Sequence, residues 1–319
     1  MIGKKKSISI PSKNIKKFLE NIHCPICGSK DYKVILNNKY GKLKNSKNLI
    51  SLYRSSSEIK VIDQLVECKK CNLEYLNPRI KESIIVSSYK SAVDKKHITQ
   101  NIYRIETFYN SLKKLNKKLN LNNFLNLRGL DVGSASGSFL CATKKFNFKC
   151  IGIEPSIWLA KYGRKKYKVD LIQGTLDTFK VKSKFDIIFF WDVLEHLTNL
   201  NKTLIKVKKI SKNKSLLIIN IPDKNSLVAK IFGKKWPFYI NVHLYNFNKK
   251  SISALLKKYN YNLIQQFPHF QILSLGYVLK KASNYNIVFL YIYKLANFLG
   301  LANVPIKYNL GQTTFVFKK

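Results

Sequence analysis

The chain has 319 residues, which is enough to bury a full α/β core and to carry one small additional domain. Four of its six cysteines form two close pairs, which favours a metal site in a reducing compartment over a disulfide framework. A formal net charge of +41 is typical of chains that bind nucleic acid or anionic membranes. Here the lysines are scattered, and Asn, Ile, Tyr and Phe are also abundant. A/T-rich codons therefore account for much of the excess charge.

Residues 1–20 are basic and are expected to be frayed. Lys4, Lys5 and Lys6 are followed by polar sequence, so this segment does not have the pattern of a secretory signal. The longest apolar stretch, 287–304, is interrupted by Lys294 and Asn297 and makes a poor transmembrane helix. We therefore expect a cytoplasmic chain whose membrane contact, if any, is peripheral.

Two C-x2-C pairs lie in residues 21–80 and supply four thiolates, Cys24, Cys27, Cys68 and Cys71. Each pair is followed by a residue that tolerates a left-handed turn, Gly28 or Asn72. Strands are predicted at 32–36 and 60–67 around a polar loop. The spacing predicts a zinc ribbon, and its Zn²⁺ would be structural because four cysteines leave no open coordination position.

Residues 81–125 are expected to form a helical lead-in, because an apolar stripe recurs at helical spacing from residue 83 to residue 121. The stripe comprises Ile84, Ile85, Tyr89, Ile102, Ile105, Phe108, Leu112, Leu115 and Leu119. Most of these side chains are expected to be packing residues, although Tyr89, Tyr103 and Arg104 could reach a ligand.

Residues 126–222 begin with a strand predicted at 127–132. In the run Leu130 to Leu140 the apolar strand ends in an acid and passes through a loop of Gly and small residues into a helix. Gly133 and Gly137 allow the backbone to approach a ligand, and the helix start offers free N–H groups. Ala135 replaces a third glycine, and we expect this position to need a small residue rather than a positive φ. Alone, such a turn is a weak sign of a nucleotide site.

Four further strand signals follow, at 149–154, 169–173, 185–191 and 215–221, with helical segments between them. The second strand closes on Glu154, and the fourth is followed by the run Asp192 to Leu197, DVLEHL. Together these motifs resemble the class I S-adenosylmethionine (SAM)-dependent methyltransferases of the "DVLEHL" group (methyltransferase types 11 and 23), over residues 75–319. The resemblance implies an α/β, Rossmann-like, seven-stranded fold preceded by the zinc ribbon.

The resemblance also implies a cofactor site. By resemblance, the loop around the methionyl part of SAM is formed by Asp131, Gly133, Ser134, Ala135 and Gly137. Glu154 would take the ribose hydroxyls, and Thr175, Leu176 and Asp177 would flank the adenine. Trp191 and Asp192 would close the pocket at the fourth strand.

Residues 223–319 resemble the C-terminal part of the same domain, with insertions that cover the acceptor. The segment His243 to Phe247 resembles an HLYxF element that precedes the last helix. A final strand is predicted at 313–317, and the aromatic insert at 270–304 is interpreted first as a substrate cover or dimer contact, and second as a membrane-surface helix. No acidic residue follows Asp223, which suits an anionic acceptor.

His243 is the first candidate for a general base, and a purely structural role in its loop is the alternative. His196 is the second candidate. Asp192, Glu195 and His196 have the spacing of one helical face, so they form a candidate site for a divalent cation. Otherwise this face only lines the cofactor pocket.

The first hypothesis for function is a SAM-dependent C- or O-methyltransferase of a small, phosphate-bearing acceptor. By resemblance, this is a nucleotide-linked sugar or a related precursor of surface polysaccharides or secondary metabolites. The second is an RNA methyltransferase with the ribbon as its RNA-binding module. The third is a non-catalytic SAM-binding scaffold. The sequence leaves the acceptor atom and the oligomeric state open.

Overall fold

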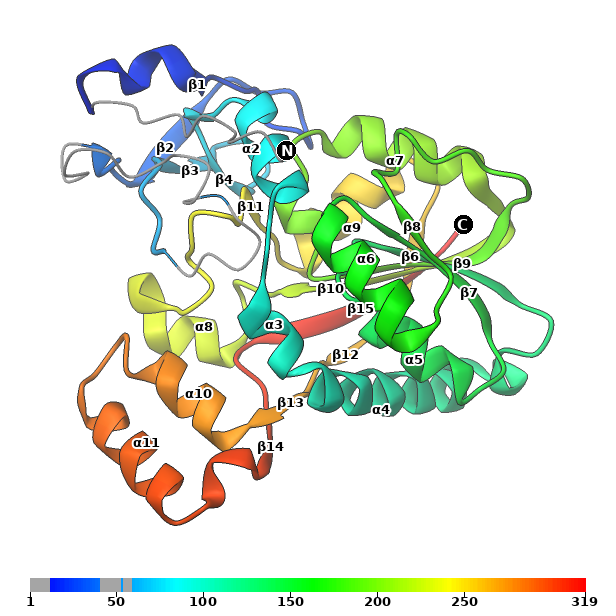
Figure 1. The fold of residues 1–319 in the computed structure, drawn as a ribbon. Helices are drawn as coiled ribbons and strands as arrows, with labels where there is room; N and C mark the ends of the chain where they lie inside the picture. The colour runs from blue at the N-terminus through cyan, green and yellow to red at the C-terminus, as the bar shows by residue number, and fades with distance from the viewer. Residues whose placement is uncertain (1–11, 41–52, 54–58) are drawn as a thin grey trace, which may run out of the picture.

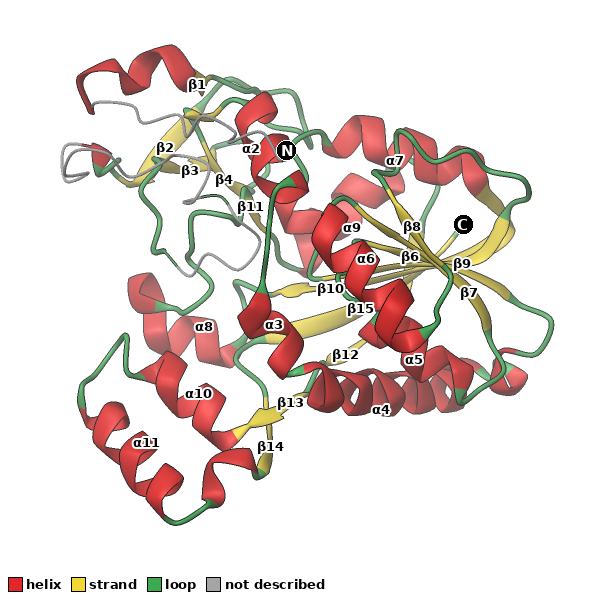
Figure 2. Ribbon diagram, viewed as in Figure 1, coloured by secondary structure: helices red, strands yellow, loops and turns green. Residues whose placement is uncertain are grey.

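The computed structural model describes residues 12–40, 53 and 59–319, and its centre is a seven-stranded sheet (Figures 1 and 2). The strand order is β12-β15-β10-β9-β6-β7-β8. β6, β7, β8, β9 and β10 pair in parallel, and β15 runs antiparallel between β10 and β12. The bounds are β6 Arg128–Val132, β7 Lys149–Glu154, β8 Leu171–Gln173, β9 Phe185–Trp191, β10 Ser211–Pro222, β12 Asn262–Pro268 and β15 Gln312–Lys318. This is the seven-stranded, Rossmann-like fold that the resemblance implied.

The central strands are buried on both faces, as their continuous apolar sequences predict. In β9, six of the seven residues are buried, and only Asp186 is partly exposed. Helices α4 (Asn101–Leu119) and α5 (Ser138–Lys144) pack on one face, while α7 (Leu200–Ile210) and α9 (Lys249–Lys257) pack on the other. α6 (Ile157–Tyr167) connects β7 to β8. Two apolar clusters, one on each face, form the core.

The predicted lead-in helix is divided into three: α2 (Glu82–Lys90), α3 (Lys95–Thr99) and α4. The break has a local cause, because the Asp94 side chain accepts a hydrogen bond from the backbone N–H of His97 and so starts α3. The predicted stripe fails at Ile102, whose side chain is exposed. Leu112 and Leu115 are buried as predicted.

A second sheet lies at the N-terminal end of the chain and has the order β11-β4-β3-β2. Its strands are β2 (Tyr32–Leu36), β3 (Leu65–Cys68), β4 (Glu74–Leu76) and β11 (Tyr245–Asn246). β2 agrees with the prediction, whereas the strand predicted at 60–67 begins only at Leu65. Lys60 forms an isolated antiparallel bridge with Ile240, and Asn241 Oδ1 accepts the backbone N–H groups of Ile62 and Asp63. This stretch therefore pairs with the segment before β11 and not with a strand of the sheet.

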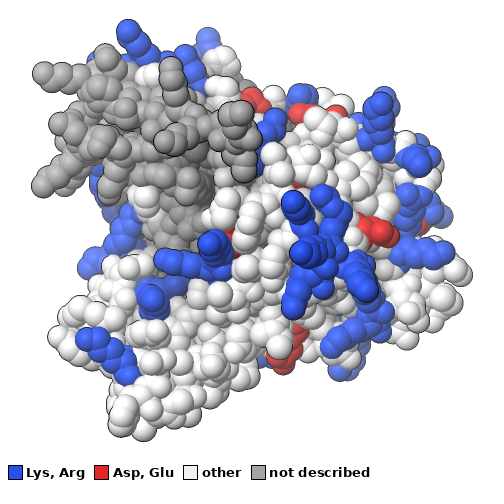
Figure 3. Space-filling view, in the orientation of Figure 1, with Lys and Arg blue, Asp and Glu red and all other residues white. Residues whose placement is uncertain are grey.

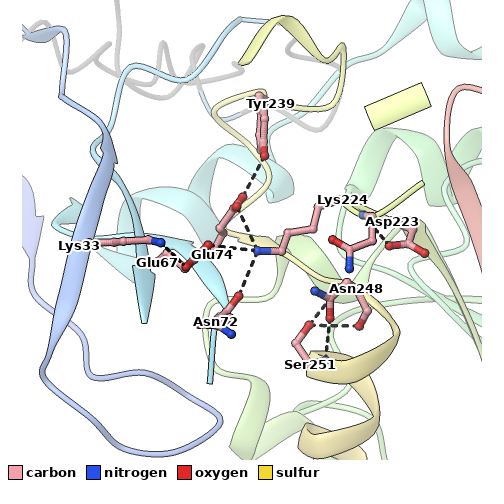
Figure 4. Close-up of polar contacts among 10 residues, drawn as sticks. Lys33, Glu67, Asn72, Glu74, Asp223, Lys224, Tyr239, Asn248 and Ser251 are labelled. Atoms are coloured by element: carbon pink, nitrogen blue, oxygen red, sulfur yellow. Dashed lines mark hydrogen bonds and ion pairs between the residues drawn. The ribbon is translucent and has the colours of Figure 1, made fainter. Parts of the chain in front are cut away.

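Buried ionic contacts fix this N-terminal sheet to the rest of the chain (Figure 4). Lys224 Nζ lies 3.0 Å from Glu74 Oε1 and also donates to the backbone oxygen of Asn72. Tyr239 donates its hydroxyl proton to the other oxygen of Glu74. Strand β11 comes from the same late part of the sequence, and Tyr245 pairs with Tyr75 of β4.

The remaining elements are short. A ribbon of β13 (Gln271–Ser274) and β14 (Pro305–Tyr308) carries a helical hairpin formed by α10 (Leu275–Ala282), α11 (Val288–Phe298) and η6 (Leu301–Asn303). The others are η1 Ser12–Phe18, β1 Leu19–Glu20, β5 Arg79–Ile80, η3 Asn122–Phe124, η4 Leu194–His196, α8 Leu227–Phe232 and η5 Gly233–Lys235. Within the described ranges, no helix has the length and apolar character needed to span a bilayer.

Candidate cofactor and acceptor sites

The loop between β6 and α5 has a left-handed backbone at three positions, with φ of +76° at Gly133, +47° at Ala135 and +82° at Gly137. A Cβ on Gly133 would lie 2.6 Å from Val193, and one on Gly137 would lie 2.9 Å from Val169. Both positions thus require glycine for backbone conformation and for packing. The expectation for Ala135 was wrong, because this alanine does adopt a positive φ.

Glu154 holds this loop in place. Its Oε2 accepts a hydrogen bond of 2.8 Å from the backbone N–H of Ala135, and its Oε1 accepts one of 2.7 Å from Ser156. Burial raises the pKa of Glu154 to about 7. Asp131, at the end of β6, is also buried, and its pKa is likewise raised to about 7 by burial. Ser134 donates its hydroxyl proton to the backbone oxygen of Asp131.

Three predicted adenine neighbours follow β8 and have different surroundings. Thr175 lines a cavity of about 270 Å³ together with Ile153, Gly174 and Phe179. Leu176 is buried in the core. Asp177 instead forms an exposed ion pair with Lys202 of α7, with Nζ and Oδ2 2.8 Å apart.

Trp191 and Asp192, at the end of β9, border a second, narrow pocket. Asp192 has a φ of +54°, and it accepts hydrogen bonds of 2.6 Å from Asn220 and 2.7 Å from Gln312. Burial raises its pKa to about 6. Two buried donors in the residues lining this pocket, Nε of Arg104 and Nε1 of Trp191, have no hydrogen-bond partner in the part of the chain that the structure describes. The pocket thus offers N–H groups to a ligand.

His269 also lines this pocket, and sequence reasoning missed it. It follows β12, and its ring centroid lies 5.5 Å from that of Trp191. Burial lowers its pKa to about 3, so the imidazole is neutral and can accept a proton only from a strongly acidified group. A single histidine just before the aromatic insert gave no motif that would have marked it.

His243, the first candidate base, is grouped with Glu195 and His196, and their ligand atoms all lie within 4.8 Å of one another. His243 Nδ1 lies 2.8 Å from the backbone oxygen of Phe238, and His196 Nδ1 lies 2.9 Å from that of Val242. A carbonyl only accepts, so each Nδ1 carries the proton and each Nε2 presents a lone pair. Burial lowers the pKa of both rings, that of His196 to about 4.

The carboxylate of Glu195 completes this acceptor cluster. It is buried, and neither of its oxygens has a hydrogen-bond partner among the described residues. Oε1 lies 3.9 Å from His196 Nε2. Two ring lone pairs and a carboxylate therefore gather, with the Tyr89 hydroxyl 3.1 Å from His196 Nδ1 at the edge of the cluster, and a cation or a proton among them would make the arrangement favourable.

The predicted cation set differs from this cluster by one residue. Asp192 lies outside the group, because the chain turns at its left-handed backbone before η4 begins. The spacing of a continuous helical face therefore does not apply, and His243 joins Glu195 and His196 in place of Asp192.

The four paired cysteines meet at one point. Cys24 Sγ lies 3.4 Å from Cys71 Sγ, and Cys27 Sγ lies 3.4 Å from Cys68 Sγ. All four sulfur atoms lie within 4.8 Å of one another. Four thiol donors around one point fit a tetrahedral metal ion of the kind predicted.

A family model described as a methyltransferase domain matches residues 100–266, slightly more than half of the chain. The chain belongs to this methyltransferase family. The matched residues include strands β6 to β10, the loop between β6 and α5, and Glu195. The family and the Rossmann-like fold place the chain among class I SAM-dependent methyltransferases.

Curated relatives match only about a third of this chain. An uncharacterised protein of Methanocaldococcus jannaschii is 34% identical over 109 residues, which cover 34% of the chain and 51% of that protein. A ubiquinone biosynthesis O-methyltransferase of Rhodopseudomonas palustris is 26% identical over 123 residues, covering 36% of the chain and 49% of the enzyme. The chain thus spans about half the length of the curated relatives it matches.

Solved structures of methyltransferases are similar at low sequence identity. Magnesium protoporphyrin IX methyltransferase from Synechocystis PCC 6803 has a TM-score of 0.47 at 12% identity, with 75% of the chain and 100% of that enzyme covered. A SAM-dependent methyltransferase from Archaeoglobus fulgidus has a TM-score of 0.43 at 18% identity, with coverage of 71% and 100%.

Proposed function

We propose that the protein transfers a methyl group from SAM to a carbon or oxygen atom of a small anionic acceptor. A nucleotide-linked sugar, or a related precursor of surface polysaccharides or secondary metabolites, is the acceptor class we favour. The observation that carries the donor half of this proposal is the buried pair Asp131 and Glu154 beside the left-handed loop after β6.

These residues suit the chemistry of SAM, which supplies an activated methyl group on a sulfonium and also carries an ammonium and a ribose diol. Asp131 and Glu154 provide the only kind of side chain that both attracts the cationic part and accepts hydrogen bonds from the diol. The left-handed loop places its backbone next to Glu154, whose Oε2 accepts from Ala135 N–H. Glu154 can therefore orient the loop and contact a bound ribose with its remaining acceptor capacity.

The acceptor half rests on the pocket beside Trp191. The partnerless N–H groups of Arg104 and Trp191 would be satisfied by oxygen atoms of a phosphate or carboxylate. Arg104 adds a positive charge that is always present. His269 in the same pocket is a rival to His243 for the role of general base, because it lines the pocket and His243 does not. Its lowered pKa restricts it to a proton that methyl transfer has made strongly acidic.

The test supplies purified protein with methyl-labelled SAM and cell extract divided into nucleotide-sugar, lipid and RNA fractions. Label in the nucleotide-sugar fraction is expected. Label only in RNA would replace this proposal by an RNA methyltransferase, and SAM binding without transfer to any fraction would favour a scaffold.

Variants then separate the roles. Arg104→Lys keeps the charge but lacks the Nε donor, so KM for the acceptor should rise at least tenfold while SAM affinity is retained. His269→Asn and His243→Asn are compared side by side, and the true base is the one whose loss lowers kcat and moves the pH profile.

We also propose two metal sites. The four cysteines would hold a structural Zn²⁺. Glu195, His196 and His243 would hold a divalent transition-metal ion, because imidazole nitrogen suits such ions better than Mg²⁺ or Ca²⁺. Three protein ligands would leave coordination positions for an oxygen ligand.

The second site can be tested without an activity assay, using protein that carries one equivalent of Zn²⁺ per chain, which the four thiolates bind in preference to the Glu195 cluster. Thiolates bind Mn²⁺ poorly, so Mn²⁺ added to this protein reports on the Glu195 cluster. Electron paramagnetic resonance should show one bound Mn²⁺ per chain. Glu195→Gln should weaken binding at least tenfold, and His97→Asn on α3 should leave it unchanged. Absence of Mn²⁺ binding by the wild-type protein would mean that a proton on Glu195 satisfies the cluster.

A further inference from the structure

The helical hairpin of α10, α11 and η6 projects from the body of the protein on the β13–β14 ribbon (Figure 1). Tyr103 of α4 donates its hydroxyl proton to the backbone oxygen of Asn303 and so holds the base of the hairpin. Strand β13 of the same ribbon lines the pocket beside Trp191 through Gln271, Ile272 and Leu273. The hairpin is therefore directly connected to the proposed acceptor site.

Helix α11 is apolar on nearly all of its sides, yet it is exposed. Its sequence is VFLYIYKLANF, and Ala296 is its only buried residue. Such a helix is normally found in a protein core or in a membrane. Phe298 is 86% exposed and Tyr291 64% exposed. We use "hairpin patch" for the exposed side chains of Ile287, Tyr291, Leu295, Phe298, Leu299 and Leu301.

A contiguous apolar surface of this kind indicates a binding surface, whereas isolated exposed side chains need no explanation. The space-filling view shows the hairpin end of the molecule as a mostly uncharged surface with Lys or Arg at intervals around it (Figure 3). Ile102 and Ile205, by contrast, are exposed apolar side chains on α4 and α7, elements far from α11 in sequence.

Three lysines of the described residues lie over aromatic rings of the hairpin and its ribbon. Lys280, Lys294 and Lys307 place their ammonium groups 5.7, 5.8 and 5.2 Å from the ring centroids of Tyr293, Tyr291 and Phe270. These lysines lie along aromatic side chains, an arrangement in which apolar stems and rings can enter an interface while the charges stay at its surface. No acidic residue follows Asp223 in the chain.

The positive charges distinguish between two partners for the hairpin patch, a second copy of the protein and an anionic membrane. A second copy of the hairpin would bring like-charged lysines together across a symmetric interface. An anionic bilayer surface would receive the apolar side chains in its headgroup region and attract each lysine. We infer that the hairpin patch docks the protein onto anionic lipid membranes as a peripheral, non-spanning contact.

Flotation with vesicles tests this inference on the full chain. One set contains phosphatidylcholine alone and the other contains phosphatidylcholine with 30% phosphatidylglycerol, about one anionic lipid in three. The protein should float with the anionic vesicles. The variant Tyr291→Ser/Leu295→Ser/Phe298→Ser should bind them at least tenfold more weakly, because insertion of apolar area is lost while every charge is kept.

The matched control is Ile102→Ser/Ile205→Ser, which removes exposed apolar side chains elsewhere and should bind like the wild-type protein. Equal binding by the triple variant would overturn the inference, because adsorption would then follow from the overall positive charge alone. No binding to anionic vesicles would also overturn it. So would a wild-type dimer that the triple variant converts to a monomer, with no vesicle binding by either protein.

Discussion

The backbone N–H of Ala135 donates a 2.8 Å hydrogen bond to Glu154 Oε2, and this contact joins the loop after β6 to the end of β7. Glu154 Oε1 receives the N–H of Ser156 in the same way. Both carboxylate oxygens thus face backbone donors. The residue that the resemblance assigns to the ribose also fixes the loop that would surround the methionyl group.

Glu154→Gln should weaken SAM binding at least tenfold, equivalent to about 1.4 kcal/mol. A glutamine presents one oxygen and one NH₂ group, so one backbone N–H would face another donor and the loop would shift. Isothermal titration calorimetry measures the change. Glu106→Gln on the exposed face of α4 is the control and should retain wild-type affinity. Unchanged affinity in Glu154→Gln would show that this side chain does not organise the donor site.

Ala135→Gly should raise the free energy of unfolding by about 0.5–1 kcal/mol, because glycine adopts a φ of +47° without the strain that alanine carries. The melting temperature should rise by about 1–3 °C in differential scanning calorimetry. Ala142→Gly, inside α5, is the matched control and should lower stability by about 1 kcal/mol or more. A loss of stability in both variants would contradict the assigned loop conformation.

Asp131 gives a prediction for pH dependence. Its pKa is raised by burial to about 7 from 3.8, so the folded state binds a proton more tightly than the unfolded state. Its contribution to stability is full below pH 3.8 and is lost as the pH rises through 7. Asp131→Asn removes this titration, so the stability of the variant relative to wild type should increase by about 1–3 kcal/mol between pH 5 and pH 8.

Urea unfolding of both proteins at the two pH values measures this difference. Groups such as His196 titrate in both proteins and cancel in the comparison. A difference between variant and wild type that is the same at both pH values would mean that Asp131 is already ionised in the folded state at pH 5.

Cys68→Ser should remove one of the proposed zinc ligands and the metal with it. Wild-type protein should contain one Zn²⁺ per chain by inductively coupled plasma mass spectrometry, and the variant should contain well under half of that. Stability should fall by several kcal/mol, because metal binding contributes folding energy directly. Cys141→Ser, outside the cluster, should keep its zinc. Metal-free wild-type protein of full stability would reject the zinc site.

The sequence predicted most reliably those elements that are continuous apolar runs. β7 and β9 begin and end where expected, because burial on both faces leaves an uninterrupted apolar stretch. β10 begins at Ser211, earlier than predicted. Its first residues are polar and have no strand pattern of their own, and they are part of the strand because Ser211 pairs with Phe185 of β9. Pairing with a distant strand has no local signal.

Site residues that are close together in the sequence were predicted, and those that only the tertiary fold brings together were missed. The four cysteines come together as their two pairs suggested. The helical spacing of Asp192, Glu195 and His196 was misleading, because a left-handed residue breaks the helix before it starts. His243 joins the cluster, and His269 reaches Trp191, through tertiary contacts between segments far apart in sequence.

The pairing of β11 with β4 has a consequence for biosynthesis. Tyr245 must be available before the edge of Tyr75 is covered, so the first sheet to be translated is among the last to be completed. Until then the early strands expose an unpaired edge while the ribosome adds about 170 further residues, at ~5–20 residues per second. On a ribosome, the proposed Zn²⁺ would be the contact that holds the two cysteine pairs together before the sheet around them is closed.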